Sequence, residues 1–307
     1  LNFFPTFALL YRISKRMPLK QIFIIALLFS ASAVYSQGIL KNVSIEAFGG
    51  FANYQGELQE KNYTFSQAKP AGALGASYAL TDKISLRGLI TYGNIQGADS
   101  YSSSLQRRQR NLSFHSKIYD ASLAGVYEFF DIMEKRYTPY VFAGVSIFNM
   151  GPYAFDSLGK KIGLRNLGTE GQGLPEYPDR KKYNYQNISI PFGGGIRFAV
   201  TRNVSLGWEF RFNKTFTDYL DDVSSKYADR GILLAAEGQK AVEMAYRGGE
   251  LKNGNPVYPA AGTVRGNPKT KDWYYFSGIT LSFKLFNDRD FNNGNRGKGI
   301  PCPKNVY

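Results

Sequence analysis

The only histidine of this 307-residue chain, His115, is the first candidate for a catalytic residue. His115 lies close to two serines, Ser113 and Ser116, so a serine nucleophile activated by histidine is the reaction to consider. Neither the spacing nor a third, orienting group supports a charge-relay arrangement. We therefore interpret His115 as a solvated side chain or one that contacts lipid headgroups. We predict no catalytic residue and no enzymatic activity.

A group of aspartates is the second candidate. Asp218, Asp221 and Asp222 occur in the stretch TDYLDDVS and could together hold a calcium ion. Calcium loops usually gather more oxygen ligands at regular spacing around a glycine turn. We therefore expect these carboxylates to accept backbone N–H bonds in a turn, or to pair with the basic residues 180–182. Cysteine–histidine metal clusters are absent from the sequence, and we predict neither a metal nor a cofactor.

The residues around these candidates alternate with a period of two. In IPFGGGIRFAV and VSLGWEFRF, apolar residues occupy every second position, whereas glycine, arginine and glutamate lie between them. Alternation of this kind predicts β-strands with one apolar face. The glycine run 193–195 is not a phosphate loop, because no helix with Lys-Ser/Thr follows it. Eight such segments recur, at residues 42–54, 71–80, 84–95, 116–130, 138–149, 190–200, 204–212 and 274–286.

The lengths of the strands and their links narrow the fold class. Strands of this length are long for a globular protein but match the roughly 9–11 residues that cross a bilayer. Short links (81–83, 131–137 and 201–203) alternate strictly with long ones. Outer-membrane barrels have this asymmetry, with short periplasmic turns and long extracellular loops. The sequence therefore predicts an all-β fold, an eight-stranded antiparallel transmembrane β-barrel with both termini in the periplasm. Residues 231–246 favour a short helix, interrupted near Gly238, in the last long loop.

The alternation also divides the side chains between lipid and lumen. Tyr92, Tyr127, Phe129 and Trp208 are expected to form aromatic girdles facing lipid. An eight-stranded barrel has an interior just wide enough for side chains to fill it, so inward charges should neutralise one another as buried pairs. The predicted lumen charges are Glu46, Arg87, Asp120, Glu128, Arg197, Glu209, Arg211 and Lys284.

The ends of the chain differ from this pattern. Met17 begins a basic start that is followed by an apolar run and then small residues, which together predict a secretory signal peptide cleaved after Ser36. We expect residues 1–36 to be an upstream extension plus signal peptide, residues 37–286 to form the barrel, and residues 287–307 to be a periplasmic tail. The single cysteine, Cys302, is either an idle thiol in this tail or one that pairs with another chain.

The net charge of +14 indicates the kind of partner. For an exported protein with scattered basic residues, anionic lipid and lipopolysaccharide phosphates are nearer partners than nucleic acid, which we do not expect. The predicted location is the cell outer membrane.

Several motifs resemble those of a known family. The pieces LGTEGQG, ISIPFGGGIR, WEFRFNKTFTDYLDDVSSKY and GGFANYQGEL, with a Cys-Pro-containing end, are similar to the Bacteroidota outer-membrane barrels that include PorG of the type IX secretion system. The resemblance implies a non-enzymatic structural component that anchors a periplasmic ring made of a PorK-like lipoprotein and a PorN-like protein.

Only periplasmic turns and the tail could reach such a ring. The candidate partner contacts are therefore Asp82, Lys83, Arg202, Asn203 and Cys302, a choice that follows from the predicted topology. The alternative is a general small outer-membrane barrel that binds a ligand or a surface partner through its long extracellular loops.

Overall fold

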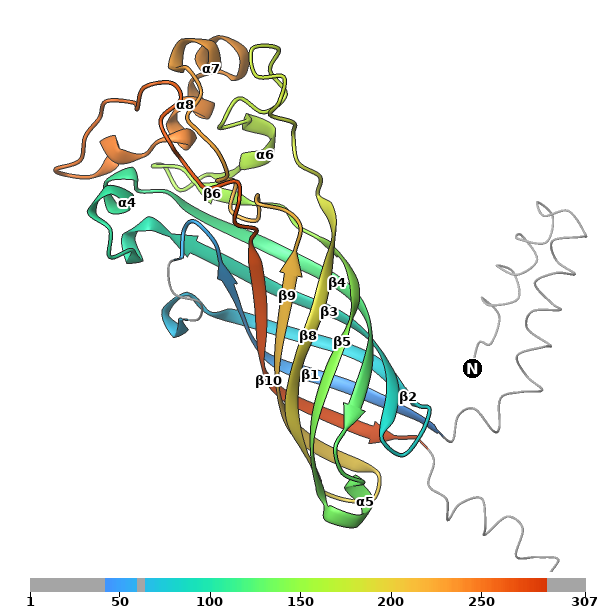
Figure 1. The fold of residues 1–307 in the computed structure, drawn as a ribbon. Helices are drawn as coiled ribbons and strands as arrows, with labels where there is room; N and C mark the ends of the chain where they lie inside the picture. The colour runs from blue at the N-terminus through green and yellow to red at the C-terminus, as the bar shows by residue number, and fades with distance from the viewer. Residues whose placement is uncertain (1–41, 60–63, 286–307) are drawn as a thin grey trace, which may run out of the picture. The chain divides into compact units, whose positions relative to one another are not determined.

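The computed structural model describes residues 42–59 and 64–285, and Figure 1 shows their arrangement. The predicted signal segment, the predicted tail and Cys302 lie outside the described residues. Ser44–Phe283 form one unit built around a β-barrel. The barrel strands are β1 (Val43–Gln55), β2 (Lys69–Ala79), β3 (Ile84–Ala98), β4 (Ser113–Glu128), β5 (Tyr137–Asn149), β8 (Gln186–Ala199), β9 (Val204–Thr215) and β10 (Trp273–Lys284).

The eight strands close on themselves. Their order is β3-β2-β1-β10-β9-β8-β5-β4, and a further antiparallel pairing joins β3 to β4, from Ile84–Tyr127 to Ala98–Ser113. Paired strands run antiparallel, as in the β9–β10 and β8–β9 registers, and the blue β1 lies beside the red β10 in Figure 1. The predicted fold class is confirmed: this is a closed eight-stranded antiparallel barrel of the outer-membrane type. No helix within the described ranges is long and apolar enough to cross a bilayer.

The outward face of the barrel carries an apolar belt with aromatic edges. On β4 the outward residues between Tyr119 and Tyr127 are apolar or small, and this nine-residue span matches the length needed to cross hydrocarbon. Tyr92 on β3 stands opposite Tyr119, with the two rings 5.1 Å apart. Trp208 is 52% exposed on the same outer face, as predicted. Beyond Tyr119 the outward positions of β4 become polar, so the strand continues past the belt.

Three strands extend beyond their predicted bounds toward the end of the barrel where the outward positions of β4 become polar. β3 extends to Ala98, β4 begins at Ser113 and β8 begins at Gln186, each several residues outside its predicted segment. The extra residues of β3 and β4 lie beyond the belt, where neither face must be apolar, whereas the extension of β8 still exposes Ile188. The period-two signal therefore fades although the backbone ladder continues.

One end of the barrel, here called the hairpin end, has short links. The β2–β3 and β8–β9 turns share one design, in which a threonine hydroxyl accepts two backbone N–H bonds. Thr81 Oγ1 accepts from Lys83 and Ile84 at 3.2 and 3.0 Å, and Thr201 Oγ1 accepts from Asn203 and Val204 at the same distances. The β4–β5 link contains one turn of helix, α5 (Ile132–Lys135). β1 begins and β10 ends at this end, as the strict alternation of links requires.

The opposite end, here called the loop end, is covered by the links 99–112, 150–185 and 216–272, which we call the loop-end cap. Its regular elements are η3 (Asp99–Tyr101), α4 (Leu105–Arg110), β6 (Tyr153–Phe155), β7 (Lys161–Gly163), α6 (Leu164–Leu167), α7 (Arg230–Glu237), α8 (Gln239–Ala245) and η4 (Gly248–Glu250). The first long link adds η2 (Phe65–Gln67). The helix predicted within 231–246 is confirmed as α7 and α8, which are separated by Gly238 at a φ of +84°. Leu220, Val223 and Met244 of the cap share one buried core with Tyr54 and Phe276 of the barrel.

The glycine run on β8 makes room for lumen rings. A Cβ on Gly195 would lie 2.7 Å from the Tyr140 hydroxyl and 2.2 Å from the backbone oxygen of Trp208. A Cβ on Gly193 would lie 2.9 Å from the ring of Phe142. Both glycines are therefore required by the close approach of large inward side chains and neighbouring backbone.

Candidate functional site

The lumen of the barrel contains a chain of alternating charges. Glu209 accepts from Arg87 at 2.5 Å and from Arg211 at 3.0 Å, so it lies between two arginines. Arg87 also lies 3.7 Å from Glu46, and Glu46 is 3.3 Å from Arg197. Arg197 ends the chain on Glu128 at 2.7 Å. Three arginines thus alternate with three glutamates from β1, β3, β4, β8 and β9.

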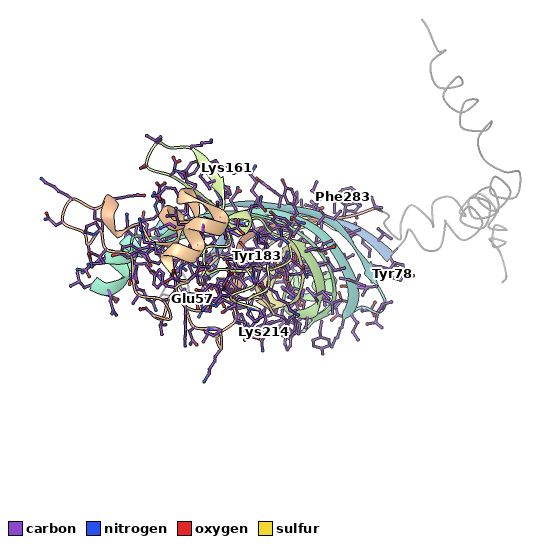
Figure 2. The ribbon with its side chains drawn as sticks, turned by 90° about the horizontal axis from the view of Figure 1, so that it is seen from above. Glu57, Tyr78, Lys161, Tyr183, Lys214 and Phe283 are labelled. Atoms are coloured by element: carbon purple, nitrogen blue, oxygen red, sulfur yellow. The ribbon has the colours of Figure 1, made fainter. Side chains whose placement is uncertain are left out.

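Neutral groups complete the surroundings of this network. The Tyr140 hydroxyl donates to Glu209 at 2.9 Å, and Arg211 donates to Thr91 at 3.0 Å. The Arg87 guanidinium also lies 4.3 Å from the centre of the Phe142 ring. Figure 2, turned by 90° from Figure 1, shows side chains crowded within the curved sheet. Arg87, Glu209 and Arg211 are 2%, 0% and 1% exposed, so no room for water is left beside them and the inward side chains occlude the lumen.

Two of the eight predicted lumen charges lie outside this chain of ion pairs. Asp120 is buried and accepts from the Tyr274 hydroxyl at 2.8 Å. Lys284, the last residue of β10, is half-buried and forms no ion pair with another described residue. Parity along the strands thus brings six of the eight side chains into one network.

An occluded lumen should not conduct ions. In planar bilayers we expect the purified protein to give no steady channels above background, because passage would have to break buried ion pairs. Large, long-lived conductance steps from the folded barrel would contradict the occlusion. A gel mobility that changes on boiling identifies the protein that has folded into a barrel.

The four described candidate partner contacts lie at the hairpin end. Asp82, Lys83 and Arg202 are exposed, whereas Asn203 is partly buried in its turn. The two turns they occupy belong to β2–β3 and β8–β9, which are not neighbours in the sheet. The structure therefore presents these residues to solvent at separate points on the same end of the barrel.

The loop-end cap is organised around a buried arginine, Arg265. Its guanidinium donates to the Glu170 carboxylate at 2.9 Å, to the backbone oxygen of Asp222 at 2.5 Å and to that of Ala245 at 3.3 Å. Glu170 also accepts from the backbone N–H groups of Ser224 and Ser225, at 2.9 and 3.0 Å. One ion pair thus joins the second and third segments of the cap.

A second buried arginine extends this connection to the first cap segment. Arg110 forms a two-pronged bond with Asp99, at 2.8 and 2.7 Å, and also donates to the backbone oxygen of Arg265. Bidentate pairs of this kind fix geometry as well as charge. The three long links are therefore held together by charged hydrogen bonds that link residues far apart in the sequence.

The three aspartates of TDYLDDVS form no ion pair with residues 180–182, which was one of the two alternatives that the sequence left open. Asp222 accepts from the hydroxyls of Thr169 and Tyr183 at 2.5 and 2.7 Å, and lies 4.0 Å from Arg265. Asp221 accepts from the backbone N–H of Val223 at 2.9 Å, which is the turn bond that was predicted. The fold instead places Arg265, 43 residues further along the chain, beside Asp222.

Sequence reasoning missed the partners of Asp221, which are Glu57 and Asp272. One carboxylate oxygen from each of the three residues lies within 4.8 Å of the others, and all three side chains are buried. Burial, with the charges of Asp221 and Asp218, raises the pKa of Glu57 to about 9. Burial also raises the pKa of Asp221 to about 7, and burial with the Asp221 and Glu57 charges raises that of Asp272. The site thus strongly disfavours three negative charges by themselves.

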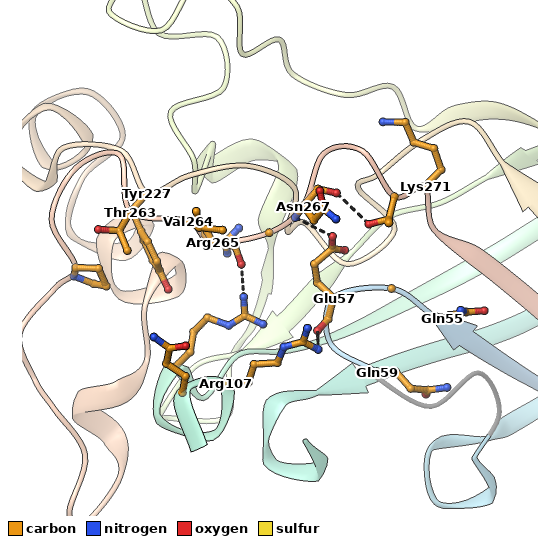
Figure 3. Close-up of a pocket in the computed structure, with 16 residues that line it drawn as sticks. Gln55, Glu57, Gln59, Arg107, Tyr227, Thr263, Val264, Arg265, Asn267 and Lys271 are labelled. Carbon is orange, nitrogen blue, oxygen red and sulfur yellow. Dashed lines mark hydrogen bonds between the residues drawn. The ribbon is translucent and has the colours of Figure 1, made fainter. Parts of the chain in front are cut away.

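A cavity of about 850 Å³ adjoins this group of carboxylates (Figure 3). Its wall includes Glu57, Arg107, Arg110, Arg265 and Lys271, so it carries both signs of charge. Arg107 donates to the backbone oxygen of Glu57 at 3.0 Å, and the Asn267 N–H donates to the Glu57 carboxylate at 3.1 Å. The cavity is lined by segments that follow β1, precede β4 and precede β10.

His115 has aromatic neighbours in the structure. Its ring stacks on Tyr153 at 5.5 Å and meets the edge of Phe155 at 5.4 Å. The neighbouring serines have other partners: Ser116 accepts from the Gly151 N–H at 3.1 Å, and Ser113 accepts from Arg247 at 3.4 Å. Among the described residues, the geometry therefore brings no serine nucleophile to this histidine.

Comparison with known families bears on the whole barrel. The sequence model of a family described as a domain of unknown function, DUF6089, matches residues 19–233, which include seven of the eight barrel strands. The chain belongs to the DUF6089 family. The matched region of this DUF6089 protein ends within α7, so the match includes Asp221 and Glu57 but not Arg265 or Asp272. No protein with a curated description matches the chain.

Solved structures of similar fold are outer-membrane proteins. Neisserial surface protein A is 14% identical to this DUF6089 protein over 80% of this chain and 97% of its own, with a TM-score of 0.39. OprG from Pseudomonas aeruginosa is 11% identical over 80% and 98%, with a TM-score of 0.38. Ail of Yersinia pestis, solved with the heparin analogue sucrose octasulfate, is 10% identical over 78% and 97%, with a TM-score of 0.34.

Proposed function

We propose that this protein is an outer-membrane barrel that acts as a non-enzymatic structural component of the type IX secretion machinery. In this role the hairpin end and both termini face the periplasm and anchor a ring made of a PorK-like lipoprotein and a PorN-like protein. The observation that carries the proposal is the occluded lumen, which leaves the two ends of the barrel as its working surfaces. The sequence resemblance to the PorG-containing Bacteroidota family supplies the identity of the partners.

The hairpin end offers a compact surface for such an anchor. The two threonine-capped turns are short and hydrogen-bonded, so docking onto them requires little ordering of the chain. Exposed charges of both signs lie on Asp82, Lys83 and Arg202. Such charges contribute more to the orientation of a complex and the choice of partner than to its affinity.

Charge reversal tests the anchoring role. The triple variant Asp82→Lys, Lys83→Glu and Arg202→Glu should stop cargo secretion and abolish co-purification with the ring lipoprotein, because it inverts the charges presented to the ring. Lys161→Glu, an exposed charge reversal in the loop-end cap, is the matched control and should leave both intact. A difference in gel mobility between boiled and unboiled samples confirms that each variant is folded. Normal secretion from cells that lack the gene would refute the proposal.

A second candidate function is binding of a ligand or surface partner at the loop end. It is favoured by the folded cap, whose cavity of about 850 Å³ includes Arg107 and Lys271 in its wall. The double variant Arg107→Glu and Lys271→Glu should then abolish binding of an anionic surface ligand such as lipopolysaccharide while secretion continues. Unchanged binding in this variant would exclude the cavity as the binding site.

A further inference from the structure

Three buried carboxylates meet where neighbouring strands reach the loop end. Glu57 follows β1 by two residues, Asp272 directly precedes β10, and Asp221 lies in the link that follows β9. Because β1, β10 and β9 are adjacent in the sheet, their ends bring these acids to one place. The oxygens of the three residues lie within 4.8 Å of one another.

None of these acids forms an ion pair with a basic side chain of the described residues. Their bonds come from neutral donors: the Tyr54 hydroxyl to Asp221 at 2.6 Å, the Leu220 N–H to Asp272 at 2.9 Å, and the Asn267 N–H to Glu57. The nearby guanidinium groups of Arg110 and Arg265 pair with Asp99 and Glu170 instead. Buried carboxylates without a cation are costly, so the site requires either protons or a positive ligand.

Two unpartnered oxygens point to a positive ligand. Glu57 Oε2 and Asp218 Oδ1 have no hydrogen-bond partner in the described structure, although both residues are more than nine-tenths buried (8% and 3% exposed). Asp218 is not one of the three clustered acids, but its charge raises the pKa of both Glu57 and Asp272. Glu57 also lines the cavity, so water and ions have a route to the group.

We propose that Glu57, Asp221 and Asp272 bind one calcium ion, with Asp218 and water from the cavity available for the remaining positions. Calcium takes six to eight oxygen ligands at roughly 2.3–2.6 Å, so two ligands on opposite sides of the ion are about 4.6–5.2 Å apart. The three oxygens lie within 4.8 Å of one another, so they can all contact one calcium ion. Magnesium demands near-ideal octahedral geometry and usually keeps several waters, and zinc prefers nitrogen and sulfur ligands.

Calcium would join the first, seventh and eighth barrel strands to the cap through one ion. The site does not depend on a role in secretion, because it lies at the end of the barrel away from the proposed ring. Its loss should loosen the cap and leave the lumen network unchanged.

Terbium luminescence and thermal unfolding test the site on the full-length chain, refolded in detergent and stripped with chelator. Terbium should bind saturably with luminescence sensitised by Tyr54, calcium should displace it, and magnesium should displace it at least tenfold less well. Calcium chloride should also raise the unfolding midpoint, since a ligand of the folded state stabilises it by mass action. Absence of calcium-displaceable luminescence in the wild-type protein would overturn the proposal.

Carboxamide variants locate the ion. Glu57→Gln and Asp272→Asn should each weaken terbium binding at least tenfold, because each removes one carboxylate ligand. Asp156→Asn is the matched control, because this cap carboxylate already has Lys240 as its partner at 3.2 Å, and it should keep the calcium response. Retention of the response in both cluster variants would place calcium elsewhere and refute the site. If a variant fails to fold, the wild-type displacement experiment decides.

Discussion

Replacing Arg265 with methionine is expected to open the loop-end cap while the barrel stays closed. The side chain is 4% exposed and holds Glu170 together with backbone oxygens from two other turns. Removing one partner of a buried ion pair costs about 3–5 kcal/mol, because the other charge stays buried without compensation. Methionine fills part of the volume but supplies no donor. Amide hydrogens of α7 and α8 should therefore exchange about a hundredfold faster or more, since 1.4 kcal/mol corresponds to a factor of ten.

Lys182→Met provides the matched control for this exchange measurement. Its ammonium group pairs with Glu237 at 3.1 Å within the same cap, but the lysine is 36% exposed and the pair is solvated. Exposed pairs contribute about 0–1 kcal/mol, so exchange in α7 and α8 should change less than tenfold. Equal protection in the Arg265→Met protein and the wild type would show that the apolar packing of the cap, and not the arginine, holds it closed.

Glu209→Gln is expected to be the most destabilising conservative change inside the barrel. Glu209 is completely buried and lies between Arg87 and Arg211, so the carboxamide leaves two arginines facing a neutral group. We expect a loss of about 3–5 kcal/mol in the free energy of unfolding. Urea unfolding in phospholipid vesicles, followed by tryptophan fluorescence, measures this loss as a lower midpoint. Because Trp208 lies on the lipid-facing surface, its fluorescence changes when the unfolding chain leaves the bilayer.

Asp120→Asn tests whether charge or mere polarity matters in the lumen. Asp120 is also a buried inward carboxylate, but it accepts a hydrogen bond from the neutral Tyr274 hydroxyl, which an asparagine oxygen can still accept. The expected loss is below about 1 kcal/mol, the typical net contribution of one hydrogen bond, because this bond is kept. Similar losses for Glu209→Gln and Asp120→Asn would contradict a dominant role for the ion pairs.

The barrel could be predicted because its pattern is local. Each strand alternates residue by residue, and the short and long links follow one another in the chain, so strand number, order and the inward parity of Arg87 or Glu209 can all be read without knowing long-range contacts. The strand extensions near Ala98 and Ser113 could not be read in this way, since they lie beyond the apolar belt.

The cap could not be predicted because its contacts join distant links. Arg265 meets Glu170 across 95 positions, and neither residue lies in a periodic segment that would orient it. The carboxylate cluster is an intermediate case. Glu57 and Asp272 flank the first and last strands, and a closed barrel must place these two strands side by side. The predicted closure, combined with an acid at each strand end, could therefore have indicated that these two carboxylates meet.

The polar extension of β4 past Tyr119 also determines how far the cap stands from the bilayer. Six residues, 113–118, continue beyond that tyrosine. At a rise of about 3.3 Å per residue and a tilt of about 45°, they raise the rim by roughly 14 Å. The cavity and its carboxylates therefore lie above the hydrocarbon, beyond the reach of acyl chains. A ligand can enter that cavity only with a polar part that extends into the aqueous layer.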